Sequence, residues 1–255
     1  MIKGLNKTLA AAVLLTSVLF FTSCVNTRKA TYFNDLKDST RFSPTKLPQS
    51  LIEPNDILNI TVGSLNPEAT TIFNQPVKPN GETTGYLVES NGNILFPELG
   101  SIKAEGLTKE QLKAAIAKQL VDKKLLIDPI VSVRFQNFRV TVLGEVRNPS
   151  VIPVPSEKIS LLEAIGLAGD LTIYAKRDNV LVIREENGEK TVKRMNLNST
   201  ELFTSPYYYL KSNDVVYVEP NKTKIATAGR AQVWMPVVFS ALSFLTIVAD
   251  RVFIK

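Results

Sequence analysis

The chain has 255 residues, of which 44% are hydrophobic and 21% are charged, and its formal net charge is +6. This is the composition of a globular protein with one to three small domains rather than of a disordered chain. The chain has no histidine, which excludes Ser-His-Asp triads, Cys-His dyads and His-ligated metal sites. Its one cysteine excludes an internal disulfide and a CxxC motif. The positive charge is mild and unclustered, so we expect no nucleic-acid partner.

The beginning of the chain has the pattern of a secretion signal. Lys3 and Lys7 supply positive charge, and residues 9–21 form an apolar stretch that is short for a membrane span. The residues FTSC at 21–24 then place small side chains before Cys24. This motif resembles the lipobox of bacterial lipoproteins, in which the cysteine becomes the acylated N-terminus. We expect a signal peptide at 1–23 and lipidation, including palmitate, at Cys24; the alternative is an ordinary signal peptide with a chance cysteine.

Residues 24–49 are polar and poor in apolar side chains, which predicts a lipidated tether or an irregular lead-in. Residues 50–137 form the first expected domain. Its β-rich segments are 57–62, 94–96 and 130–135. Thr108 followed by Gln111 is typical of a helix N-terminus with a capping box, and apolar residues follow at helical spacing.

Residues 138–221 form the second expected domain. Its predicted strands are 140–146, 180–184, 191–195 and 215–218, and the Asn-Gly pair at 187–188 favours a hairpin between the middle two. Ser160 with Glu163 predicts a second capped helix, which Gly169 ends. Both units mix strands with one helix, so the predicted fold class is α+β with two small β-rich domains.

Each unit contains three motifs that follow one another in the order found in a known protein family. The first unit contains "EPNDILNITV", "ESNGNILFPELGSIKAEGLTKEQLKAAI" and "DPIVSVRF", and the second contains "VTVLGEVRNPSVIPV", "SLLEAIGLAGDLT" and "YYYLKSNDVVYVEP". The first unit resembles the polysaccharide export domain of Wza-like outer-membrane auxiliary lipoproteins. The second is similar to the soluble-ligand-binding β-grasp (SLBB) domain that follows it there. Ser150 and Asp170 stand at turn positions where the family commonly has glycine.

The resemblance implies a subunit of an outer-membrane channel that exports capsule or exopolysaccharide. The expected protein is lipid-anchored, keeps its domains in the periplasm and assembles into a homo-oligomeric ring. Its expected partners are the polysaccharide and an inner-membrane polysaccharide copolymerase with its tyrosine kinase. The mechanism is passive translocation, so we expect no enzyme, no cofactor and no metal. The alternative is a monomeric outer-membrane lipoprotein that binds a small ligand or glycan through its β-grasp domain.

Residues 222–231 are a basic connector, and residues 232–255 are expected to form an amphipathic or transmembrane helix. Trp234 and Arg251 lie near its ends, where membrane-interface anchors belong. The polar residues and Pro236 recur at spacings of three or four and fall within one arc of the helix, which Phe239 and Ile247 share. In a ring, we expect the polar residues to face the pore: Gln232, Ser240, Ser243, Thr246 and Asp250. A single membrane anchor or a buried helix is the alternative.

Asp56 and Asp214 occur in the similar settings "PNDILNI" and "SNDVVYV". Either acid could have a functional role, but aspartate before a strand is typically the acceptor of turn N–H groups. The three tyrosines at 207–209 could stack on sugar rings. Aromatic side chains in a β-rich segment more often pack in the core and across strands, and we expect that here.

Overall fold

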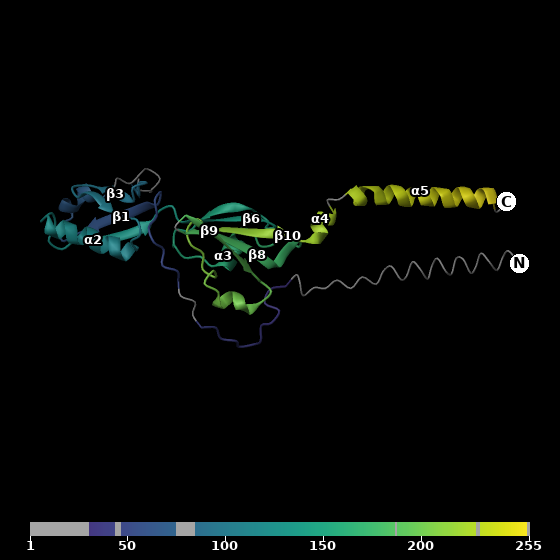
Figure 1. The fold of residues 1–255 in the computed structure, drawn as a ribbon, viewed down its shortest axis with the longest axis horizontal. Helices are drawn as coiled ribbons and strands as arrows, with labels where there is room; N and C mark the ends of the chain where they lie inside the picture. The colour runs from purple at the N-terminus through teal and green to yellow at the C-terminus, as the bar shows by residue number, and fades with distance from the viewer. Residues whose placement is uncertain (1–30, 44–46, 75–84, 187, 228–229, 254–255) are drawn as a thin grey trace.

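The computed structural model describes residues 31–43, 47–74, 85–186, 188–227 and 230–253. Two β-containing domains follow one another along the long axis of the molecule, and helix α5 (Arg230–Phe253) extends from the second domain (Figure 1). This arrangement confirms the predicted α+β class with two small β-rich domains. The expected signal peptide at 1–23 and Cys24 lie outside the described residues.

The first domain is built on a three-stranded antiparallel sheet. Strand β1 (Ile57–Gly63) lies in its centre between β2 (Tyr86–Leu87) and β5 (Ile130–Phe135). In β5, buried and exposed residues alternate strictly, because successive side chains of a strand point to opposite faces. A hairpin of β3 (Asn93–Phe96) and β4 (Gly100–Lys103) adds further buried apolar side chains. A 3-10 helix, η2 (Glu68–Phe73), follows β1.

Helix α2 (Lys109–Asp122) covers the first sheet, and its start is fixed by the predicted capping box. The Thr108 hydroxyl accepts the Gln111 N–H, and the Gln111 side chain accepts the Thr108 N–H. Leu112, Ile116 and Leu120 are fully buried at the expected helical spacing. The helix therefore packs through one apolar stripe, as its sequence predicts.

The second domain contains a five-stranded sheet of order β7-β6-β10-β8-β9. Strand β10 is parallel to β6 and antiparallel to β8, and the other neighbours are antiparallel. The predicted hairpin joins β8 to β9. The sheet also contains β7, a strand that the sequence patterns did not predict. The strands are β6 (Arg139–Gly144), β7 (Ser150–Pro153), β8 (Ala175–Glu186), β9 (Glu189–Met195) and β10 (Val215–Pro220).

Helix α3 (Leu161–Leu167) has the second predicted capping box, formed by Ser160 and Glu163. Gly169 lies just past its end with φ 81°, which confirms its role as a helix terminator. Asp170 also has a left-handed backbone, with φ 68°, at the position where glycine is common in the family. At Gly144 glycine is required, because a Cβ there would lie 2.1 Å from the Val218 carbonyl oxygen of the neighbouring strand.

Residues 31–43 were expected as part of a tether or of an irregular lead-in to the first domain, but they lie on the second domain. The backbone N–H groups of Phe33 and Asn34 donate to carbonyls at 197 and 198 over 3.1 and 2.7 Å. The Asp35 carboxylate accepts the N–H and hydroxyl of Thr200, at the start of η3 (Thr200–Thr204). The Phe33 and Phe42 rings pack against Phe203, with centroids 5.0 and 4.8 Å apart. This lead-in segment therefore belongs to the second domain.

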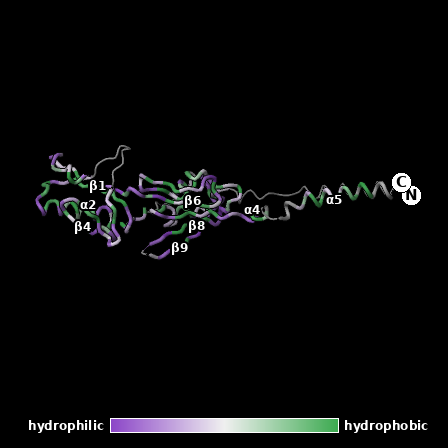
Figure 2. Tube along the Cα trace, turned by 90° about the horizontal axis from the view of Figure 1, so that it is seen from above, coloured by the Kyte–Doolittle hydropathy of each residue, from purple (hydrophilic) through white to green (hydrophobic). Residues whose placement is uncertain are grey.

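The stretch 222–231, expected as a connector, contains the short helix α4 (Lys222–Thr227) and the start of α5. Because α5 begins at Arg230, Pro236 lies inside the helix rather than in its first turn. The described side chains of α5 are exposed, among them Trp234 and Phe239. Figure 2 shows α5 as largely hydrophobic or intermediate and β9, by contrast, as largely hydrophilic.

Of the helices that the structure describes, none combines the length and the apolar character needed to cross a membrane. The helix expected at 232–255 is present as α5, but its expected role as a transmembrane segment is not supported by this finding.

Candidate functional site

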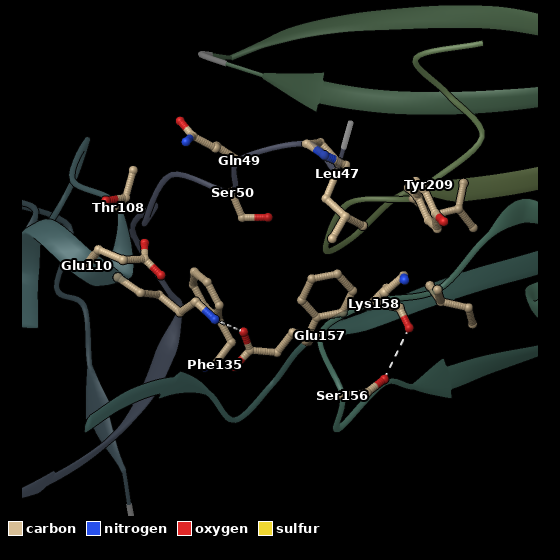
Figure 3. Close-up of a pocket in the computed structure, with 15 residues that line it drawn as sticks. Leu47, Gln49, Ser50, Thr108, Glu110, Phe135, Ser156, Glu157, Lys158 and Tyr209 are labelled. Atoms are coloured by element: carbon tan, nitrogen blue, oxygen red, sulfur yellow. Dashed lines mark hydrogen bonds and ion pairs between the residues drawn. The ribbon is translucent and has the colours of Figure 1, made fainter. Parts of the chain in front are cut away.

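A cavity of about 440 Å³ lies between the two domains (Figure 3). The lead-in before β1 and the start of α2 contribute one side, and the β7–α3 loop and the segment before β10 contribute the other. Its lining combines apolar side chains with hydroxyl, amide and charged groups. The residues that carry its polar chemistry are Gln49, Ser50, Thr108, Lys109, Glu110, Glu157, Lys158 and Tyr209.

The charges in the cavity wall are largely compensated by local contacts. The Lys109 ammonium forms an ion pair with Glu157, whose side chain is only 10% exposed. The other Glu157 carboxylate oxygen accepts the Phe135 N–H at 2.8 Å. The Lys158 ammonium lies 5.2 Å from the centroid of the Tyr209 ring, within the range of a cation–π interaction. The cavity therefore favours a ligand without strong net charge.

A smaller cleft, of about 130 Å³, lies beside this cavity and is lined by acids from both domains. Glu53 and Asp56 come from the first domain, and Glu185 and Glu186 from the end of β8. Burial raises the pKa of the Asp56 carboxyl to about 6, although its hydrogen bond from the Glu53 N–H opposes this shift. Burial also raises the pKa of Glu53. Lys211 donates to Glu186 at 2.6 Å, so the cleft is only partly neutralised.

Asp56 and Asp214 have the structural role that the sequence predicts. Each carboxylate accepts a backbone N–H three residues earlier, from Glu53 and from Lys211, at 2.8 Å in both cases. Asp214 also binds the buried Arg184 guanidinium through two oxygens, at 2.9 and 2.7 Å. This ion pair has no local sequence signal, because Arg184 lies on β8 and Asp214 in the turn before β10.

The tyrosines at 207–209 are half-buried. The Tyr207 ring lies 4.6 Å from the Arg184 guanidinium carbon, and Tyr208 packs against Phe203 and Tyr209. These contacts confirm the expected packing role. Only Tyr209 also lines the cavity between the domains.

The candidate pore-facing residues all lie on α5. The hydroxyls of Ser240 and Ser243 donate to the carbonyls of Val237 and Phe239, both at 2.9 Å, so each satisfies its donor within the helix. Trp234 is 61% exposed. The side chains of Gln232, Thr246, Asp250 and Arg251 lie outside the described part of the structure. Within that part, no cluster of three or more His, Cys, Asp or Glu could hold a metal ion.

Comparisons with known proteins match both domains. Residues 44–136 match the family described as polysaccharide biosynthesis/export protein, and residues 138–218 match the SLBB domain. The chain is 28% identical over 149 residues to the EPS I polysaccharide export outer membrane protein EpsA of Ralstonia solanacearum. It is 27% identical over 150 residues to the protein of the same name from Ralstonia nicotianae (strain ATCC BAA-1114 / GMI1000).

Each alignment covers 57% of this chain and 39% of the relative, so the chain spans well under half the length of the curated relatives it matches. The two family matches cover nearly all of the two folded domains and follow the order in which the export domain precedes the SLBB domain. The chain therefore belongs to the Wza-like family of outer-membrane polysaccharide export proteins.

Proposed function

We propose that this protein is a subunit of an outer-membrane exporter of capsule or exopolysaccharide. Lipid on Cys24 anchors it, its two domains lie in the periplasm, and several copies form a ring through which the polymer passes unchanged. The observation that carries the proposal is the succession of an export domain and an SLBB domain in a chain related to named polysaccharide export outer membrane proteins. An inner-membrane copolymerase and its tyrosine kinase deliver the polymer.

The exposed apolar surface of α5 supports assembly into an oligomer. Val238, Leu242, Phe244 and Leu245 are each more than half exposed and lie outside the arc of the polar residues. Contiguous exposed apolar surface of this kind marks a site of contact with protein or membrane. In the proposed ring, the α5 helices of neighbouring copies pack side by side through this surface.

The polar residues of α5 face the inside of the proposed ring. They are Gln232, Ser240, Ser243, Thr246 and Asp250, which lie within one arc of the helix. Trp234 and Arg251, near the two ends of α5, contact the membrane interface. Hydroxyl and amide groups suit a sugar chain, because they exchange hydrogen bonds with its hydroxyls without holding it by charge.

The decisive measurement is the mass of the full-length protein after gentle detergent extraction, beside a variant truncated before Gln232. We expect a large ring for the full-length protein and a loss of membrane association or of the ring on truncation.

Deleting the gene should block surface polysaccharide while polymer synthesis continues. The purified protein should leave the length of the polymer unchanged. A monomer in both preparations, or unchanged surface polymer after deletion, contradicts the proposal.

The cavity between the domains supports a second candidate function. Its volume of about 440 Å³ lies in the range of small-ligand pockets, and it combines apolar walls with a few polar groups. In this alternative, the protein is a monomeric outer-membrane lipoprotein that binds a small ligand or glycan at its β-grasp domain. Titration calorimetry with oligosaccharides from the host's own polymer distinguishes the two, because the alternative requires saturable binding to a monomer.

A further inference from the structure

The polypeptide passes from the first domain to the second between Asn137 and Phe138. Asn137 is bound to the first domain, since its side chain accepts the Ile57 N–H at 3.0 Å and donates to the Asn55 carbonyl at 3.1 Å. Phe138 is bound to the second, since its carbonyl accepts the Val154 N–H at 2.9 Å. A rotation at this junction would change the angle between the domains without breaking either sheet. It would also move the lead-in, which crosses between the domains a second time before Ile52.

Glu157 spans this junction. It lies in the loop between β7 and α3 of the second domain, and both groups that its side chain binds belong to the first. They are the Lys109 ammonium, in the first turn of α2, and the Phe135 N–H, at the end of β5. Hydrogen bonds to a carboxylate, whether from an ammonium or from a backbone N–H, are stronger than hydrogen bonds between neutral groups.

The backbone at Glu157 reinforces its position. Its φ is 55°, in the left-handed region that side chains other than glycine and asparagine rarely adopt. Such a conformation persists where the surrounding contacts determine it. Next to Glu157, a cavity of about 440 Å³ lies between the domains (Figure 3). At this place the two bonds of the Glu157 side chain join the second domain to the first across the cavity wall.

We propose that Glu157 is a positioning residue that locks the two domains at one angle across the junction at Asn137–Phe138. The consequence for assembly rests on the proposed ring. Head-to-tail copies close into a ring only when each is related to the next by a fixed rotation, and otherwise form open or mixed assemblies. The lock fixes that rotation by fixing the shape of each subunit.

Two variants and one control test the lock in the detergent-extracted full-length protein. Glu157→Asn tolerates the left-handed backbone but is too short to reach both partners. Lys109→Met removes the ammonium and leaves the Phe135 hydrogen bond in place. Glu110→Gln is the matched control, since Glu110 lines the same cavity and is exposed. The measurement is hydrogen–deuterium exchange resolved at the Phe135 amide, together with the particle mass.

For Glu157→Asn we expect exchange at Phe135 to accelerate about tenfold or more, because its acceptor is lost. Lys109→Met should give a smaller increase, and the control none. Amides in the β1–β5 and β8–β10 ladders should keep their exchange rates in all three variants. The wild type should give one ring mass, and Glu157→Asn a spread of masses.

Unchanged exchange at Phe135 in both Glu157→Asn and Lys109→Met overturns the lock, even if the ring is present. The lock is also overturned if exchange in Glu157→Asn accelerates equally at Phe135 and in the β1–β5 and β8–β10 ladders, because Glu157 would then support only the general stability of the fold. If exchange changes as expected while the wild type is a monomer, the lock stands and the proposed ring is wrong.

Discussion

Asp56 and Asp214 occupy the same local turn in the two domains. In both, the preceding asparagine has a left-handed backbone, with φ 73° at Asn55 and 65° at Asn213. In both, the carboxylate accepts the backbone N–H three residues earlier at 2.8 Å, and a strand follows. The two turns therefore have the same local geometry and the same local hydrogen bonds.

Their electrostatic surroundings differ. Asp214 is 1% exposed and binds Arg184, a buried cation, through both of its carboxylate oxygens. Asp56 is 6% exposed, and among the described residues no cation forms an ion pair with it. Burial of an unpaired carboxylate disfavours its charged form, whereas a bound guanidinium compensates for burial. The same turn motif can therefore hold either a compensated or an uncompensated charge.

The largest expected effect comes from breaking the compensated site. Asp214→Asn keeps an acceptor for the turn N–H but leaves the Arg184 guanidinium buried without its counter-ion. We expect the free energy of unfolding to fall by about 3 kcal/mol, since removing one partner of a buried ion pair is strongly destabilising. Denaturant unfolding followed by circular dichroism measures this loss.

A matched control replaces a member of an exposed ion pair. In Lys103–Glu105, the side chains are 57% and 43% exposed, so Lys103→Gln should change stability by less than about 1 kcal/mol. Combining Arg184→Leu with Asp214→Asn should recover part of the loss, because the uncompensated charge is then gone. Equal losses in the free energy of unfolding for Asp214→Asn and Lys103→Gln would show that the buried ion pair stabilises the protein no more than the exposed pair does.

The same substitution at the uncompensated site should have the opposite sign. Burial raises the folded pKa of Asp56 to about 6 from an ordinary value of 3.8. The folded state therefore binds this proton more tightly than the unfolded chain does. The stability that Asp56 contributes is fully present below pH 3.8 and is lost as the pH rises through 6.

Asp56→Asn removes the charge and keeps an acceptor for the Glu53 N–H. At pH 8, we expect it to raise the free energy of unfolding by about 1 kcal/mol, after allowing for solvent screening of the charge. The gain should disappear as the pH falls from 6 to 4. Unfolding curves of the variant and wild type at several pH values test this; a loss of stability at pH 8 would contradict the account of Asp56 as an uncompensated charge.

The smallest expected effect concerns the part that the two turns share. Asn55→Ala and Asn213→Ala should each cost about 1 kcal/mol, because alanine disfavours the left-handed backbone. Asn→Gly at the same positions should be nearly neutral. Thermal unfolding of the four variants measures this, and clearly unequal losses for the two alanine variants would show that the turns are less alike than their geometry indicates.

Much of the fold follows from short-range patterns in the sequence. The capping boxes at Thr108 and Ser160 and the terminator at Gly169 are predictable because their hydrogen bonds join residues a few positions apart. Alternation and turn residues likewise predict the longer strands and the β8–β9 hairpin. The short strands β2, β4 and β7 were missed, since a few residues give little periodic signal and their pairing partners define them.

The local turns, the capped helices, the fold class and the family motifs are all predictable from the amino-acid sequence. Which charges are compensated and which segments meet depends on the packing of the folded chain. Val215 pairs with Ile183, so the β8–β10 register brings Arg184 beside Asp214. Glu157 reaches Lys109 across 48 positions, and Asp35 reaches Thr200 across 165. Such contacts depend on how whole sheets and domains pack, and no local pattern encodes that geometry.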